Sequence, residues 1–168
     1  RAELKDICPL LEDSASRLAY ARDLWPLGHI AAGAGDVEAL GSRPWAISCP
    51  RDEQEVSKVV KVAAKHKIPI IPFGEGSGVC GGTVALRGGI TVDLKQLRRI
   101  ERIDRESLTI TVGAGMNGQL LEEALERESL TLGHSPSSIL CSTVGGWLAA
   151  RSAGQFSTLY GKIEDMII

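Results

Sequence analysis

The stretch from Pro69 to Gly82 constrains this 168-residue chain more than any other, because a short apolar run there leads directly into a glycine-rich segment. The apolar run predicts a buried strand, and the segment after it holds five glycines in nine residues. Glycine adopts backbone conformations that a side chain forbids, and its amide N–H groups can point at an anion without obstruction. The stretch predicts either a loop that cradles phosphate groups or a glycine-rich turn between two strands.

Composition is that of a globular domain and argues against several partners. The chain is 43% hydrophobic and 24% charged, which are ordinary values. A net charge of −2 without a long basic run argues against nucleic acid and against a polybasic membrane anchor. No apolar run approaches the roughly 20 residues of a membrane-spanning helix, and no signal-peptide pattern opens the chain. We therefore predict a cytoplasmic protein.

The four cysteines are far apart and form no C-x-x-C pair. This spacing predicts reduced thiols rather than a zinc site or a disulfide framework, so we expect no metal. Cys80 and Cys141 lie in or near glycine-rich segments, and for each we favour the role of a small buried hydrophobe.

The first part of the chain, residues 1–43, is interpreted as an arm. Residues 3–24 have a broken amphipathic spacing that predicts a helix, which Trp25 and Pro26 would end. The small residues from Gly28 to Gly41 predict a loop or linker.

The region before the glycine-rich segment predicts a strand–helix–strand unit. Trp45–Cys49 is a short strand closed by Pro50, and Asp52 stands three residues before Glu55, which is a capping-box signature. An amphipathic helix follows, and then the strand Ile68–Pro72. This is a βαβ unit whose second strand leads into the glycine-rich segment.

A dinucleotide fingerprint in this segment is misleading. Gly76-x-Gly78-x-x-Gly81, with Asp93 downstream, matches the Rossmann pattern, but that pattern requires a helix to open within the loop. Residues 83–94 predict instead a loop or hairpin and then a strand. A Rossmann domain is therefore disfavoured, and a Walker loop is excluded because no Gly-Lys-Ser/Thr occurs.

The remaining residues predict a second lobe. Strands at 100–103 and 108–112 precede a helix that Asn117 caps and that ends near Glu128, and residues 163–168 predict the start of another strand. The fold class is α+β: a domain at 44–168 with a first lobe at about 44–83 and a second at about 84–168. The seam between two such lobes is a natural ligand cleft.

A second unusual segment runs from Leu132 to Gly154. Ser142 or Thr143 is expected to cap a short helix whose first turn contains two glycines, and such a helix start favours polar or anionic groups. Arg151 suits either a phosphate or a surface salt bridge, and His134 either a ligand or loop packing. Two glycine segments suggest one long ligand held at two points, and a dinucleotide such as FAD fits that shape.

At these residues the chain resembles the FAD-binding domain of the vanillyl-alcohol oxidase/p-cresol methylhydroxylase (PCMH-type) superfamily. Its alkyldihydroxyacetonephosphate synthase branch and the bacterial FAD-linked oxidases are the most similar. The pyrophosphate loop is matched by Pro72-Phe73-Gly74-Glu75-Gly76-Ser77-Gly78. The branch's second motif is matched by Gly133-His134-Ser135-Pro136-Ser137-Ser138 and Ser142-Thr143-Val144-Gly145-Gly146-Trp147. Residues 151–154 and 160–165 also match.

The resemblance implies a set of FAD-binding residues. They are Pro72, Phe73, Gly74, Glu75, Gly76, Ser77 and Gly78 for the pyrophosphate, and Ser137, Ser138, Ile139, Leu140, Cys141, Ser142, Thr143, Gly145, Gly146, Ala150, Arg151, Ser152 and Ala153 for the rest of the flavin. Family members with a histidine-linked flavin carry that histidine in the first loop. This chain has none there, so non-covalent FAD is expected.

The resemblance also implies a function. It is that of the FAD-binding part of a flavin-dependent oxidoreductase acting on a substrate such as a 2-hydroxy acid or alcohol. The alternatives are an alkylglycerone-phosphate synthase-like transferase and a non-catalytic piece without flavin. Family members continue into a cap that binds most of the substrate, so this chain is expected to be an N-terminal part, alone inactive, with catalytic residues unassigned. A homodimer is also an expected assembly.

Overall fold

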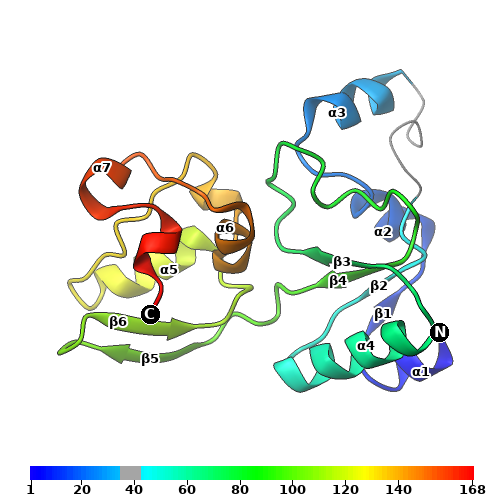
Figure 1. Ribbon diagram of the computed structural model, residues 1–168, viewed down its shortest axis with the longest axis horizontal. Coiled ribbons are helices and arrows are strands. Elements are labelled where there is room, and N and C mark those ends of the chain that lie inside the picture. The colour runs from blue at the N-terminus through cyan, green and yellow to red at the C-terminus, as the bar shows by residue number, and fades with distance from the viewer. Residues whose placement is uncertain (35–42) are drawn as a thin grey trace. The chain divides into compact units, whose positions relative to one another are not determined.

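A four-stranded sheet organises the N-terminal half of the computed structural model, which describes residues 1–34 and 43–168. The strand order is β1-β2-β4-β3. β1 (Leu10–Leu11) runs antiparallel to β2 (Ala46–Ser48), while β2 and β3 (Ile70–Phe73) each run parallel to β4 (Ile90–Asp93). Figure 1 shows β4 between its two parallel neighbours. Every residue of β4 is buried, as expected for the centre of a parallel sheet.

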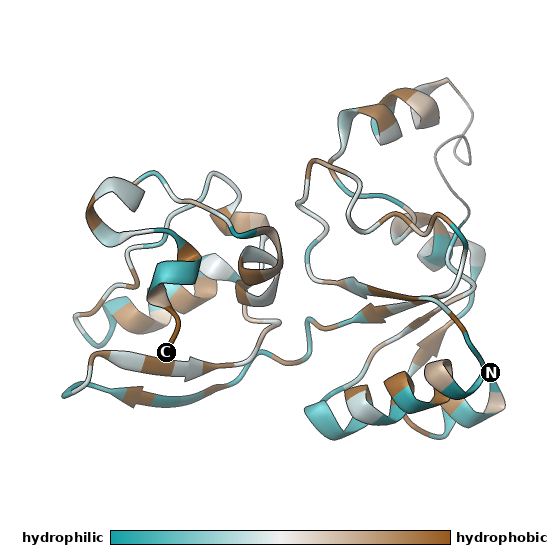
Figure 2. Cartoon of the chain, viewed as in Figure 1, coloured by the Kyte–Doolittle hydropathy of each residue, from teal (hydrophilic) through white to brown (hydrophobic). Residues whose placement is uncertain are grey.

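Helix α4 (Glu53–Lys65) covers one face of this sheet. The Asp52 carboxylate accepts a hydrogen bond from the Glu55 backbone N–H at 2.8 Å, so the predicted cap is confirmed. Hydrophobic and hydrophilic residues alternate along the helix (Figure 2). Its apolar side enters a buried cluster made of Leu4, Cys8, Val59, Ala63, Ile90 and Val92.

The N-terminal residues differ from the predicted arm. Instead of one helix at 3–24 they form α1 (Ala2–Lys5), β1, α2 (Ser14–Ala19) and α3 (Pro26–Gly33). Pro9 precedes β1, and Asp13 begins α2 by accepting a bond from the Ser16 N–H. Pro26 begins α3 instead of ending a helix, because proline is well tolerated in a first turn. The predicted linker thus starts as a helix, and its residues 35–42 lie outside the described part.

The two lobes are also divided at a different place. The chain separates into two compact units, Arg1–Gln96 and Leu97–Ile168, whereas we predicted a boundary near residue 83. β4 is the reason, because it pairs inside the first sheet with β2 and β3. The predicted strand–helix–strand unit is present, but its two strands are not neighbours. No helix occurs in the described residues 79–88, so the argument against a Rossmann domain is confirmed.

The second unit is a β-hairpin with helices packed on it. β5 (Ile100–Asp104) pairs antiparallel with β6 (Thr109–Val112). Asn117 caps α5 (Gly118–Glu126), as predicted. Short elements follow: η1 (Ile139–Cys141), α6 (Val144–Ala150), α7 (Ser157–Tyr160) and η2 (Ile163–Met166).

Two features define the end of this unit. Its core is made of Met116, Leu121, Leu125, Trp147 and Ile163. The prediction of a strand at 163–168 is wrong. Residues 163–166 form the 3₁₀ turn η2, because the Asp165 carboxylate accepts a bond from the Lys162 N–H at 2.8 Å and curls the backbone.

Candidate functional site

The glycine segment begins where β3 ends and is supported from within its own unit. Gly76 has a φ of +68°, and a Cβ added there would lie 2.7 Å from the Phe73 ring. Gly81 has a φ of +75°, and a Cβ there would lie 2.8 Å from the Trp25 ring. Both positions therefore require glycine for conformation and for close approach to an aromatic ring. The Leu24 N–H also donates to the Gly78 carbonyl at 2.9 Å.

The backbone amides of this segment make no hydrogen bond to the described part of the chain. Within the described part of the chain, none of the N–H groups of residues 74–80 donates a hydrogen bond to a protein atom. Glu75, Gly78, Val79 and Cys80 are exposed, and the other residues are half-buried. Backbone N–H groups of a glycine-rich segment that make no bond to the described chain are suited to an anionic ligand.

The Phe73 side chain packs inside its unit, against the backbone of Gly76 in the glycine segment. This side chain is buried, and its ring centroid lies 4.7 Å from that of Tyr20. Phe73 therefore supports Gly76 from the interior, and its side chain is not presented to solvent.

A charged cluster lies at the end of β4, beside the loop. Tyr20 donates a hydrogen bond from its hydroxyl to Asp93 Oδ2 at 2.6 Å. Lys95 Nζ lies 2.9 Å from the same carboxylate oxygen and donates to the Gly74 carbonyl at 3.2 Å. Burial, and then the hydrogen bond to Asp93, raise the pKa of Tyr20. The cluster thus fastens the start of the glycine segment to the end of the neighbouring strand.

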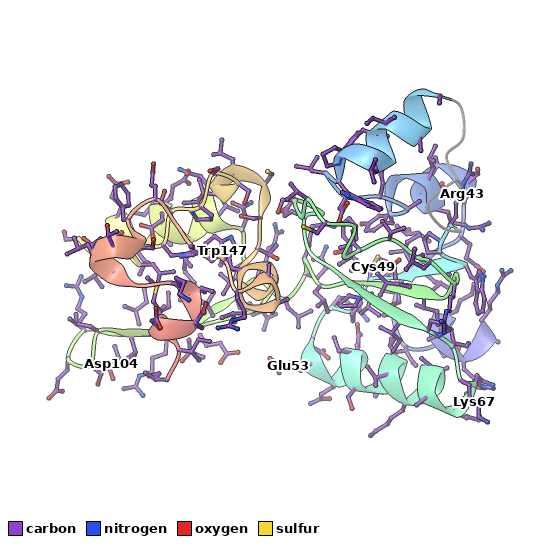
Figure 3. The ribbon with its side chains drawn as sticks, turned by 45° about the horizontal axis from the view of Figure 1, so that its top comes forward. Arg43, Cys49, Glu53, Lys67, Asp104 and Trp147 are labelled. Atoms are coloured by element: carbon purple, nitrogen blue, oxygen red, sulfur yellow. The ribbon has the colours of Figure 1, made fainter. Side chains whose placement is uncertain are left out.

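In the second unit, two predicted site residues are committed to internal bonds. Ser142 is buried, and its hydroxyl accepts from Trp147 Nε1 and donates to the Ser138 carbonyl, each at 2.7 Å. Thr143 is buried and caps α6 by accepting from the Gly146 N–H; the sequence had left the cap open between these two. Trp147, labelled in Figure 3, is enclosed by side chains of its own unit.

The two glycines at the start of α6 differ. A Cβ at Gly145 would lie 2.8 Å from Ala114 Cβ and 2.9 Å from the Ala114 carbonyl oxygen. A Cβ at Gly146 would meet only the Thr143 hydroxyl, at 3.2 Å. Gly145 therefore serves packing within the unit, whereas Gly146 is exposed and is not packed against another element.

His134 is a packing residue. It is almost fully buried, its Nε2 lies 2.7 Å from the Ser152 hydroxyl, and its ring meets the Trp147 ring edge-on at 4.8 Å. Burial lowers the pKa of His134. Of the two predicted roles, loop packing is the one that its contacts support.

Arg151 forms the salt bridge that was one of its two predicted roles. Its guanidinium lies 2.9 Å from Glu164 Oε1, which Lys162 Nζ also approaches at 3.0 Å. The bonds from Lys162, and then from Arg151, lower the pKa of Glu164 to about 2.

The other predicted residues of this segment fall into two groups. Ser137, Leu140, Cys141, Ala150 and Ala153 are exposed, and Ser138, Ile139 and Ser152 are half-buried. Cys80 and Cys141 are exposed free thiols, so their interpretation as buried hydrophobes is wrong. Each lies in a loop or short turn outside its unit's core.

Sequence reasoning missed Tyr20 and Lys95 as neighbours of the glycine segment. The available signal was Asp93, an acidic residue at the carboxyl end of a buried parallel strand, where ligand sites in such sheets occur.

No metal-binding group of His, Cys, Asp or Glu occurs among the described residues. Within the same residues, no helix is long and apolar enough to cross a membrane.

These features together define a class. A sheet whose strands β2, β4 and β3 are parallel, which leads into a glycine loop and is followed by a hairpin-and-helix unit, is an α+β domain suited to a phosphate-bearing cofactor. Residues 44–168 match the sequence profile of the FAD binding domain family. The chain belongs to that family, and FAD is the family's cofactor.

Relatives agree with this assignment. The chain is 36% identical over 166 residues to alkyldihydroxyacetonephosphate synthase of Trypanosoma brucei brucei, covering 93% of this chain and 26% of that protein. It is 32% identical over 157 residues to glycolate oxidase subunit GlcD of Bacillus subtilis (strain 168), covering 94% of this chain and 31% of that protein. It thus spans about a quarter to a third of the length of these relatives.

Solved structures show the same fold. One of an alkyldihydroxyacetonephosphate synthase superposes with a TM-score of 0.91 at 32% identity, over 99% of this chain and 31% of that chain. p-Cresol methylhydroxylase superposes with a TM-score of 0.68 at 23% identity, over 84% of this chain and 27% of that chain. The predicted PCMH-type FAD-binding fold is confirmed.

Proposed function

We propose that this chain is the FAD-binding part of a flavin-dependent oxidoreductase. The observation that carries the proposal is the run of amides at residues 74–80 that make no hydrogen bond to the described part of the chain, on a loop whose glycines at 76 and 81 adopt positive φ. Relatives named as a glycolate oxidase subunit and as a mitochondrial D-lactate dehydrogenase of Arabidopsis thaliana support a 2-hydroxy acid as the substrate class. Such a substrate would bind mainly to a cap domain.

In this proposal the chain binds and orients the cofactor. The amides from Gly74 to Gly78 hold the pyrophosphate, with Pro72 and Phe73 fixing the start of the loop. In the second unit, the exposed and half-buried residues between Ser137 and Ala153 contact the remainder of the flavin. Bound FAD supplies a hydride acceptor, which is the cofactor's own chemistry.

The test is FAD binding by the purified chain and by two glycine variants. Gly76→Ala places a Cβ against the Phe73 ring at a positive φ, which costs about 1–2 kcal/mol in the backbone alone. We expect FAD affinity, measured by quenching of flavin fluorescence, to fall by about tenfold or more. Gly82→Ala is the matched control, because nothing lies within 4 Å of a Cβ there, and it should bind FAD like the parent chain.

FAD binding by the parent chain also distinguishes the proposed function from the alternative of a non-catalytic piece without flavin. A chain with a native circular dichroism spectrum that binds no FAD would support that alternative and contradict the proposal. Non-covalent attachment has its own test. FAD should remain in the supernatant after acid precipitation, and yellow protein in the pellet would contradict it.

A synthase-like transferase is the second candidate function. Two observations favour it: the 36% identity to the trypanosomal synthase and the TM-score of 0.91 to a solved synthase. The two functions are distinguished in the full-length protein. A 2-hydroxy acid should bleach the flavin absorbance of an oxidoreductase, whereas the synthase should exchange an acyl for an alkoxy group without net bleaching.

A cytoplasmic location and a homodimer complete the proposal. Reduced, unpaired cysteines among the described residues support the first. Sedimentation velocity of the purified protein tests the second.

A further inference from the structure

We propose that Lys95 is a positioning residue for the glycine segment, and that through Gly74 and Asp93 it sets the affinity of the loop for the phosphates of its ligand. The inference rests on the proposed function, since it concerns the same loop. Lys95 does not belong to the set of residues that the resemblance implies, and it lies two residues after β4, the strand next to the one that carries the loop.

The ammonium group of Lys95 has three acceptors for its three protons. Nζ lies 2.9 Å from Asp93 Oδ2, 3.2 Å from the Tyr20 hydroxyl and 3.2 Å from the Gly74 carbonyl oxygen. It also lies 4.9 Å and 5.1 Å from the ring centroids of Tyr20 and Phe73. Since an ammonium offers three donors, Lys95 is held in one place by its own chain.

The bond to Gly74 orients an amide of the loop. Gly74 O and Glu75 N belong to the same peptide group, and the chain has no cis peptide among its described residues. In a planar trans peptide the C=O and N–H bonds point in opposite directions. Lys95 therefore turns the Glu75 N–H away from itself, and that N–H is among the unpaired amides of the loop.

Lys95 also neutralises a charge that would oppose an anion. Asp93 is 6% exposed and accepts from Tyr20, from Lys95 Nζ and from the Lys95 backbone N–H at 3.0 Å. With Lys95 the pair has no net charge. Without it, a carboxylate would remain beside a loop that has to receive phosphates, and like charges repel over about 10 Å at moderate salt.

The experiment compares three variants of the chain with FAD and with ADP as ligands, at low and high salt. Lys95→Met removes the charge and the bonds but keeps the stem. The double variant Asp93→Asn with Lys95→Met also removes the opposing charge. Its asparagine keeps a side-chain oxygen that can accept the bond from the backbone N–H of residue 95. Lys61→Met on the exposed side of α4 is the control for a lysine-to-methionine change.

We expect a graded result. Lys95→Met should weaken FAD and ADP binding by about tenfold or more, with a larger loss at low salt, because the repulsion from Asp93 is screened by ions. The double variant should recover part of the affinity and lose the extra salt dependence. Lys61→Met should bind both ligands like the parent chain.

Each other outcome has a separate meaning. If the parent chain binds FAD and ADP, and both variants that carry Lys95→Met bind them as tightly as the parent chain does, the inference is overturned and the proposed function stands. A loss that is the same at both salt concentrations in both variants would also overturn it, since a merely structural role predicts that. If Lys95→Met does not fold, the double variant, which buries no unpaired charge, carries the comparison. A folded parent chain that binds neither ligand overturns the proposed function itself.

Discussion

At the scale of single residues, the glycines separate into those that serve packing and those that leave backbone open. Gly145 sits directly against Ala114, while Gly146 in the next position faces outward. The sequence treats the two alike, since both stand in the first turn of the same helix. Only the close contact of Ala114 with Gly145 distinguishes them, and Ala114 lies about 30 residues earlier in the chain.

This difference predicts unequal effects of alanine. Gly145→Ala should lower the thermal midpoint of unfolding, because its Cβ would meet backbone that cannot move aside, and overpacking of this kind costs about 1–3 kcal/mol. Gly146→Ala should lower the midpoint less than Gly145→Ala, because its Cβ would meet only the Thr143 hydroxyl, at 3.2 Å, and alanine favours a helix over glycine by about 1 kcal/mol. Differential scanning calorimetry measures both. Equal destabilisation by the two changes would contradict the assignment.

Tyr20 supplies a second prediction at this scale. Burial, and then Asp93, raise the pKa of Tyr20 above its ordinary value of 10.0. Folding therefore favours the neutral phenol: the stabilisation is complete below pH 10 and is lost as the pH rises through the folded-state pKa. Tyr20 is one of two tyrosines, so Tyr160→Phe isolates its signal.

The measurement is an ultraviolet titration of the phenolate band in Tyr160→Phe. The midpoint should lie above pH 10 while the protein is folded, and guanidinium should bring it down to the ordinary value. A midpoint at or below 10 in the folded protein would show that Tyr20 is not held as the structure describes.

At the scale of elements, helices with clear caps were predicted and short, irregular pieces were not. Asp52 and Asn117 predict the starts of α4 and α5, because a capping side chain accepts a hydrogen bond from a backbone N–H only two or three residues later. The apolar residues of the 3₁₀ turn η2 satisfy a strand pattern, and its bond from the Lys162 N–H to Asp165 has no periodic signal in the sequence, so the pattern predicts a strand there. The sequence does not choose between the two roles of Arg151, because its partner Glu164 comes from another element.

The Arg151–Glu164–Lys162 contact predicts a pH effect. The pKa of Glu164 is lowered to about 2 from 4.5, so the ionised carboxylate stabilises the folded state at pH values above about 4.5. That contribution is lost as the pH falls toward 2. Glu164→Gln should therefore lower the thermal midpoint at pH 6 and make less difference near pH 2.

The comparison uses the difference between the parent chain and Glu164→Gln across the pH range, so that the other carboxylates cancel. A difference that is constant between pH 6 and pH 2 would contradict the lowered pKa. Glu164 is half-buried but both cations are exposed, so we expect a small effect.

At the scale of the whole molecule, each unit has its own hydrophobic cluster. The sequence predicted two lobes and the ligand class, because glycine-rich loops and their flanking strands are local patterns. It did not place the division between the lobes, since that depends on which strands pair. Nor did it assign Tyr20 to the first loop, because 73 residues separate Tyr20 from Asp93.

The second cluster predicts a contrast between adjacent leucines of α5. Leu121 is 1% exposed and Leu120 is 48% exposed. Leu121→Ala should destabilise the chain by about 2–5 kcal/mol, the usual cost of such a cavity, whereas Leu120→Ala should cost well under half of that. Urea denaturation followed by circular dichroism measures both, and similar midpoints for the two variants would contradict the described core.

The central place of β4 has a consequence for how the chain is made. β2 and β3 have no hydrogen bonds to each other and meet only through β4, which comes last of the three in the sequence. During synthesis, residues 46–73 are therefore complete before any parallel partner exists for them. Pairings between distant residues form slowly, and unpaired strand edges are prone to aggregate. The nascent chain consequently passes through an interval in which β2 and β3 lack their parallel partner, and this interval ends when residue 93 becomes available.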